Sequence, residues 1–170
     1  MRLARKTTGR ASREPLPAPG EAEPLALATL APPTRPRMFS HVFVSVTDFE
    51  RAFAFYAAVM RVLGLELRFL DPAKPWAGWH SEGKTRPYFV ICHPYDGQDH
   101  VAGNGQMVAF AADSRAQVDA AHATSLALGG VSEGAPGLRP QYHAHYYGAY
   151  FRDPDGNKFC VACHEPAPAA

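Results

Sequence analysis

Apolar and polar residues alternate in SHVFVSVTD, residues 40–48, where three valines form one side of the alternation. A period of two with β-branched residues predicts a strand that has two different faces. Residues 49–63 change to a helical period, with a stripe of apolar side chains, Asp48 at the N-cap position and Gly64 as a stop. The pattern therefore predicts a strand followed by an amphipathic helix.

Three further segments read as strands after this helix, and the same order then starts again near Gly105. The expected strands of the first half are residues 66–70, 78–82 and 87–93. The second half is expected to have a strand in 106–114, a helix in 115–130, a strand near Val131 and strands in 145–153 and 158–164, with a long turn at 134–141. The DPDGN sequence supplies the turn residues of a tight hairpin before the last strand.

The two halves can be overlaid, which indicates an internal repeat. His41 falls on Met107 at the start, and at the end we align Cys92 with Cys163. The predicted fold class is α+β, with two βαβββ units. We expect a first module at residues 38–100, a second at 104–166, and a short tail at 167–170.

Residues 1–37 have a different composition, with seven prolines, seven Lys or Arg and three Glu. Such a segment buries too little apolar surface to offset its chain entropy, so we expect it to be disordered. The formal net charge of the whole chain is +1, which leaves the remainder mildly acidic. A mildly acidic domain has no electrostatic footprint for nucleic acid. No apolar run reaches the ~20 residues of a membrane span, and three cysteines favour a reducing cytoplasm over a disulfide framework.

The repeat, the helix that ends in LGL and the DPDGN hairpin together resemble the vicinal oxygen chelate superfamily. This superfamily includes glyoxalase I, extradiol dioxygenases and the bleomycin- and fosfomycin-resistance proteins. The resemblance covers residues 38–166 and implies a curved mixed sheet that forms a cup, with helices on its outer face. It also implies a small-molecule ligand and is compatible with a homodimer.

Metal-dependent relatives take their ligands from four equivalent strand positions, an early His in each half and an acidic residue on each last strand. Carried onto this chain, these positions are His41, Phe89, Met107 and Cys160, of which only His41 matches. His41 and Cys160 are the candidate metal ligands, and they are an incomplete set for a divalent transition metal. We therefore favour a metal-free pocket, with one divalent transition metal as the alternative.

The segment FCVACHE contains a C-x-x-C-H spacing, which is typical of haem attachment and resembles half of a zinc site. Alternation along this expected strand places Cys160 toward the cup and Cys163 toward the core. Two cysteines on opposite faces cannot easily hold one haem or one zinc ion.

Further chemistry is concentrated in RPQYHAHYYGAYF. His143 and His145 are candidate acid–base residues, because imidazoles titrate near neutral pH. Arg139 could pair with a carboxylate, and Tyr147 follows the histidines in register. The candidate substrate-binding set is Met107, Arg139, Tyr147, Phe89 and Phe43. The alternative interpretation is that these histidines are solvated and only cover the cup.

Three functional hypotheses follow. The first is a glyoxalase- or dioxygenase-like enzyme, a lyase or oxidoreductase, that binds a small oxygenated molecule in the cup. The second is a metal-free protein that sequesters a small molecule, as the resistance proteins do. The third is a redox-responsive module built on Cys160, in which a nearby His41 would depress the pKa of the thiol.

Overall fold

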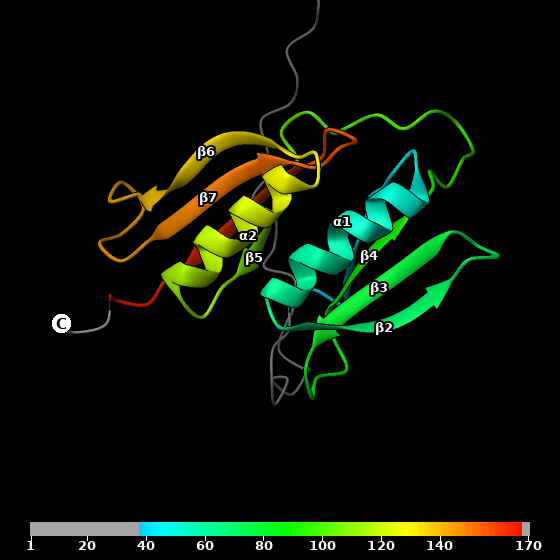
Figure 1. Ribbon diagram of the computed structural model, residues 1–170. Coiled ribbons are helices and arrows are strands. Elements are labelled where there is room, and N and C mark those ends of the chain that lie inside the picture. Colours follow the sequence, from blue (N-terminus) through cyan, green and yellow to red (C-terminus); the bar gives the residue numbers. More distant parts are fainter. Residues whose placement is uncertain (1–37, 168–170) are drawn as a thin grey trace, which may run out of the picture. The chain divides into compact units, whose positions relative to one another are not determined.

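The computed structural model describes residues 38–167 (Figure 1). The expectation of disorder at residues 1–37 lies outside this range, as does most of the expected tail. The first half consists of β1 (His41–Ser45), α1 (Phe49–Val62), β2 (Leu65–Asp71), β3 (Trp76–Ser81) and β4 (Tyr88–Cys92). The second half consists of β5 (Val108–Ala111), α2 (Arg115–Ala127), β6 (Val131–Leu138), β7 (Tyr147–Arg152) and β8 (Lys158–Cys163).

Each half forms a four-stranded mixed sheet, with the orders β1-β4-β3-β2 and β5-β8-β7-β6. The first and last strands of each half pair in parallel, and the other neighbours are antiparallel. Figure 1 shows α1 and α2 over the same side of the sheets, and the two helices contact each other. The prediction of two βαβββ units in an α+β fold is confirmed.

The helix boundaries follow from capping chemistry. The Asp48 side chain accepts a hydrogen bond from the backbone N–H of Arg51 at 3.0 Å, as expected of an N-cap. Ser114 caps α2 in the same way. Gly64 and Gly129 follow the two helices with φ of 69° and 89°, a left-handed conformation that favours glycine.

One hydrophobic core lies between the helices and the sheets and includes side chains from both halves. Phe89 of β4 meets Phe110 of β5 with ring centroids 5.0 Å apart, and Tyr56 of α1 meets Phe159 of β8 at 5.4 Å. Burial of each such aromatic side chain contributes about 1.5–3 kcal/mol. The two halves therefore share a core rather than folding around separate ones.

The strand register corrects the overlay of the two halves at their ends. Val42 pairs with Phe89 in the first half, and Val108 pairs with Phe159 in the second. Phe89 is therefore equivalent to Phe159, so the position equivalent to Cys160 is Val90. The sequence overlay is one residue out of register at this point, and one residue in a strand moves a side chain to the other face.

Two strand boundaries also differ from prediction. β6 continues to Leu138 through the segment expected to be a long turn, with register shifts on either side of Gly134. β6 lies at the edge of its sheet. It tolerates Pro136, which has no backbone N–H, because one side of an edge strand makes no ladder hydrogen bonds. β7 begins only at Tyr147, because two turns close between Arg139 and Tyr146. The histidines of this segment therefore precede the strand.

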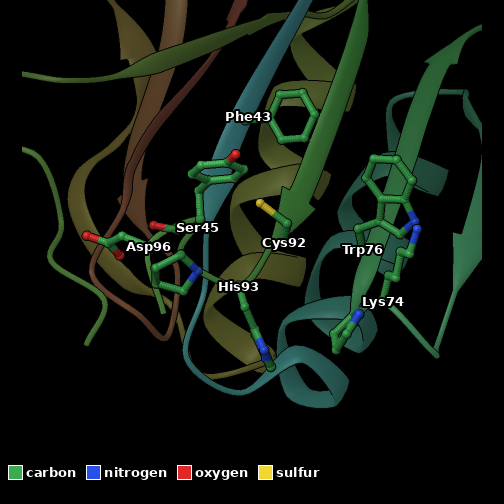
Figure 2. Close-up of a pocket in the computed structure, with 10 residues that line it drawn as sticks. Phe43, Ser45, Lys74, Trp76, Cys92, His93 and Asp96 are labelled. Carbon is green, nitrogen blue, oxygen red and sulfur yellow. The ribbon is translucent and has the colours of Figure 1, made fainter. Parts of the chain in front are cut away.

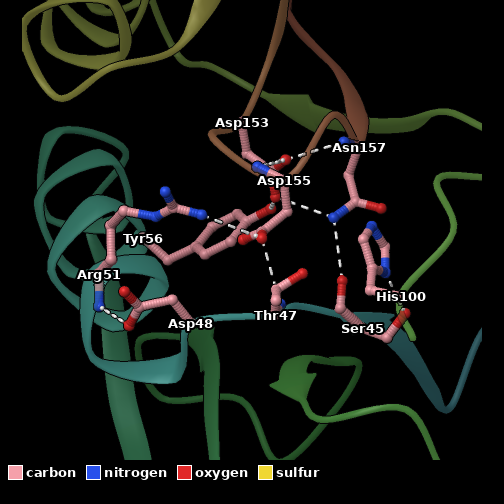
Figure 3. Close-up of polar contacts among 9 residues, drawn as sticks. All are labelled: Ser45, Thr47, Asp48, Arg51, Tyr56, His100, Asp153, Asp155 and Asn157. Atoms are coloured by element: carbon pink, nitrogen blue, oxygen red, sulfur yellow. Dashed lines mark hydrogen bonds and ion pairs between the residues drawn. The ribbon is translucent and has the colours of Figure 1, made fainter. Parts of the chain in front are cut away.

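The DPDGN turn joins the second half to the first (Figure 3). Asp153 is 2% exposed, and its carboxylate accepts hydrogen bonds from the Tyr56 hydroxyl at 2.6 Å and from the Asn157 amide at 2.9 Å. The same Asn157 amide donates to the backbone carbonyl of Ser45 at 3.0 Å. The turn thus holds the end of β1 in place. No helix within residues 38–167 is long and apolar enough to span a membrane.

Candidate functional site

A groove of about 1020 Å³ lies at the first sheet, on the side away from the helices (Figure 2). Alternation along β1 decides which residues reach it, because Val44 packs against the core while Phe43 and Ser45 face the groove. The residues that line the groove come from β1, the β2–β3 turn, the start of β3, the end of β4 and the segment after β4: Phe43, Ser45, Lys74, Pro75, Trp76, Cys92, His93, Pro94, Tyr95 and Asp96.

Three aromatic side chains line this groove and remain open to solvent. Phe43 is 50% exposed, Trp76 is 37% exposed and Tyr95 is fully exposed. Trp79 shows the contrast, because it is 2% exposed and packs in the core. Large aromatic surface left in water around a concave site is typical of a binding site rather than of a core.

The polar groups of the groove are few. Lys74 and Asp96 carry opposite charges, so the lining has no strong bias of charge. The Ser45 hydroxyl lies 2.8 Å from Nδ1 of His100, a residue in the segment that connects the two halves. Burial raises the pKa of the Cys92 thiol, which keeps this thiol protonated near neutral pH.

Cys160 lies on the face of β8 opposite Cys163, where Tyr146 and Tyr150 bury it, and it does not line the groove. The Tyr146 hydroxyl lies 3.4 Å from Sγ of Cys160 and 3.3 Å from the Tyr150 hydroxyl. Burial raises the pKa of the Cys160 thiol, an effect that the hydrogen bonds from both tyrosines partly oppose. Burial, followed by the hydrogen bond to Cys160, also raises the pKa of Tyr146. These neutral groups form a closed hydrogen-bonded cluster.

The residues present do not fit a resident metal. A cysteine ligates a metal as the thiolate, whereas the Cys160 thiol is 0% exposed and its pKa is raised. His41 is exposed, and its Nδ1 lies 3.2 Å from the Ser40 hydroxyl. Val90, the position equivalent to Cys160, has no donor atom. Among residues 38–167, no group of three or more His, Cys, Asp or Glu side chains is placed to hold a metal ion.

Of the predicted substrate-binding residues, Phe43 and Met107 come together at a second, smaller cavity of about 380 Å³. Phe89 and Tyr147 lie instead on the side covered by the helices. Phe89 is 7% exposed in the core, and the Tyr147 hydroxyl donates to Asp119 of α2 at 2.8 Å. Strand alternation explains both placements, because Phe89 and Tyr147 point to the helix-covered faces of β4 and β7.

The predicted catalytic histidines do not reach the groove. Nε2 of His143 lies 2.9 Å from Nδ1 of His164, the last residue of the C-x-x-C-H spacing. The backbone N–H of His145 donates to Nδ1 of His143, within a turn. Arg139 donates to the carbonyls of Leu138 and Ala135, so its guanidinium supports the end of β6.

The predicted site residues did not include Ser45, His93 or Tyr95, which line the groove, or His100, which contacts Ser45. The alternation along β1 already placed Ser45 on the same face as Phe43, and this signal could have found it. His100 lies 55 residues from Ser45, and no local pattern connects the two. Trp76, the first residue of β3, forms part of the groove wall.

Paired βαβββ modules with a groove on the face away from the helices define a glyoxalase-like protein. The family model described as the glyoxalase/bleomycin resistance protein/dioxygenase superfamily matches residues 38–161. The chain belongs to this family. No protein of curated function matches the chain significantly.

Solved structures of similar fold include a glyoxalase/bleomycin resistance protein from Albidiferax ferrireducens T118. It is 39% identical, with a TM-score of 0.67 over 75% of this chain and 99% of the other. A lactoylglutathione lyase from Agrobacterium tumefaciens is 25% identical, with a TM-score of 0.51 over 78% and 96% of the two chains. TioX from Micromonospora sp. ML1 is 20% identical, with a TM-score of 0.50 over 75% and 98%, and this likeness supports the fold alone.

Proposed function

We propose that this protein binds a small, planar, oxygenated molecule in the groove and does so without a metal ion. The observation that carries this proposal is the set of three exposed aromatic side chains around one concave site, Phe43, Trp76 and Tyr95. The groove volume of about 1020 Å³ is at the upper end of the range for small-molecule sites. Planar rings of a ligand would stack on these side chains and remove their surface from water.

The lining supports a neutral ligand more than a highly charged one. Lys74 and Asp96 oppose each other in sign, and no other Lys, Arg, Asp or Glu among residues 38–167 lines the groove. A strongly anionic or cationic ligand would therefore lose more hydration free energy than it gains from interactions with the groove. This supports an aromatic or conjugated compound with a few oxygen substituents.

A second candidate is a metal-dependent lyase, which the similarity to the lactoylglutathione lyase from Agrobacterium tumefaciens favours. The donor chemistry opposes it, because the Cys160 thiol is buried with a raised pKa and Val90 offers no ligand atom. Metal analysis of protein purified without added metal separates the two candidates. Stoichiometric metal, together with turnover of the hemithioacetal of methylglyoxal and glutathione, would support the lyase and contradict the metal-free binding protein.

The binding test is equilibrium dialysis of EDTA-treated protein against 2-acetonaphthone, a planar ring system that carries one carbonyl group. We expect saturable binding of one molecule per chain. The substitution Trp76→Ala removes one of the three aromatic side chains of the groove. It should weaken binding of 2-acetonaphthone about tenfold, since burial of the ligand ring and its stacking on the indole are both lost. Tyr142→Ala is the control, because Tyr142 is 61% exposed and does not line the groove.

Three outcomes would contradict the proposal. One is the absence of saturable binding, and another is equal affinity in the wild type and in Trp76→Ala. The third is binding that weakens as the protein concentration rises, which would indicate that a second copy of the chain occupies the groove.

A further inference from the structure

We infer that the Ser45 hydroxyl, positioned by His100, is the hydrogen-bond donor by which the groove selects ligands that carry a carbonyl oxygen beside an aromatic ring. This inference rests on the proposed function and names the class of ligand. Ser45 lies in the same lining as the aromatic wall, so a ring stacked on that wall has a hydroxyl within the same site.

The position of Ser45 is fixed from three directions. Its backbone pairs with Cys92 of β4 at the end of the parallel ladder. Its carbonyl accepts a hydrogen bond from the Asn157 side chain at 3.0 Å, and its hydroxyl lies 2.8 Å from Nδ1 of His100 (Figure 3). A donor held this firmly loses little conformational entropy when a ligand binds.

The surroundings of His100 decide which way the hydrogen bond to Ser45 runs. Nε2 of His100 is buried and has no hydrogen-bond partner among residues 38–167. If the Ser45 hydroxyl donated to Nδ1, Nε2 of the neutral ring would carry a buried hydrogen with no acceptor. Unpaired buried donors are rarer in proteins than underused acceptors. The favoured tautomer therefore has the hydrogen on Nδ1, which donates to Oγ of Ser45.

With His100 as the donor, the hydroxyl hydrogen of Ser45 is free to point into the groove. It can then donate to an acceptor atom of the ligand while Oγ continues to accept from the imidazole. Such a chain of hydrogen bonds polarises the hydroxyl and strengthens its donation. A carbonyl oxygen conjugated to a ring is an acceptor in the plane of the ring, which suits a site that also stacks the ring.

The test compares two probes that share a ring system, 2-acetonaphthone and 2-ethylnaphthalene, in which a methylene replaces the carbonyl. Equilibrium dialysis should show that the wild type prefers the ketone by about fivefold, the worth of one neutral hydrogen bond. Ser45→Ala should lose this preference while its affinity for 2-ethylnaphthalene stays within about twofold of the wild type.

Ser132→Ala is the matched control, because the Ser132 hydroxyl lies 2.9 Å from Nε2 of His122 and neither residue lines the groove. It should keep the preference for the ketone. If both probes bind the wild type equally, or if Ser45→Ala keeps the preference, the inference about Ser45 is overturned while the groove remains a binding site. If neither probe binds, the proposed function itself is contradicted, and the inference about Ser45 is overturned with it.

Discussion

At the scale of single residues, the fold separates the two cysteines of the C-x-x-C-H spacing, which resembled a haem or zinc motif. Cys163 packs in the core, while Cys160 contacts Tyr146 on the other side of β8. Both are buried, and Cys92 is partly exposed at the groove. Opposite faces of one strand exclude a shared haem or metal at Cys160 and Cys163. A buried thiol with a raised pKa also opposes the hypothesis of a reactive Cys160.

Thiol labelling tests this assignment. At pH 8 we expect Ellman's reagent to modify one thiol per native chain, slowly, because burial raises the pKa of Cys92 and reduces its thiolate fraction. Three thiols should react in guanidinium chloride. Cys92→Ser should reduce the native signal to near zero, and rapid labelling of Cys160 in peptide maps would instead favour the redox hypothesis.

At the scale of elements, the Asp153 carboxylate organises the turn between β7 and β8 and ties it to α1. It accepts from the backbone N–H groups of Asp155 and Asn157, which closes the turn, and from the Tyr56 hydroxyl of α1. Burial, and then the charge of Asp153, raises the pKa of Tyr56 well above 10.0. The same residues therefore fold a hairpin and join a helix to a sheet.

Tyr56→Phe should lower the free energy of unfolding by about 2 kcal/mol at pH 8, because it removes a hydrogen bond to a buried carboxylate. The raised pKa stabilises the fold below pH 10, and this contribution is lost as pH rises through the folded-state value. The difference between wild type and Tyr56→Phe should therefore shrink above pH 10.

Urea denaturation at pH 8 and at pH 11 measures both values. Tyr95→Phe serves as the control, since the Tyr95 side chain is fully exposed. A difference that stays constant or grows with pH would contradict the role assigned to the Tyr56 hydroxyl.

At the scale of the described domain, contacts far apart in the sequence connect the halves and shape the groove together. Asn157 reaches the Ser45 carbonyl across 112 residues, and Asp155 accepts from the backbone N–H of Thr47 and from Arg51. The second half therefore positions a strand end on which the groove of the first half depends.

Asn157→Ala should lower both stability and affinity, because the Ser45 carbonyl and the Asp153 carboxylate each lose a donor. We expect a loss of about 1–3 kcal/mol in urea denaturation. Dialysis should show that the preference for 2-acetonaphthone over 2-ethylnaphthalene also falls. Arg51→Ala provides the comparison, since the Arg51 side chain is 49% exposed and such an ion pair contributes about 1 kcal/mol or less. Equal losses in the two variants would contradict this ranking.

Much of the fold was predictable because its signals are local. Period-two and helical patterns, the Asp48 cap, the glycine stops and the DPDGN turn each act within a few residues, and each appears where it was expected. Strand alternation also assigned Cys160 and Cys163 to opposite faces. The pairing of β4 with β1 makes Phe89 equivalent to Phe159 instead of Cys160, and an error of one residue in register moves a side chain to the other face. β7 starts at Tyr147, after the turns that contain the histidines, so alternation does not place Tyr147 on a common face with them.

The repeated βαβββ units could be read from the chain, because hydrophobic period and turn chemistry act within a few residues of one another. The family entered as a resemblance of its motifs, and the family model matches residues 38–161. The site, in contrast, depends on contacts between residues that are far apart in the sequence. Ser45 meets His100 across 55 residues, and the Asn157 side chain reaches the Ser45 carbonyl across 112 residues. Such pairings depend on how strands align and how a connecting segment folds back. They follow from packing between distant residues, which no local pattern records.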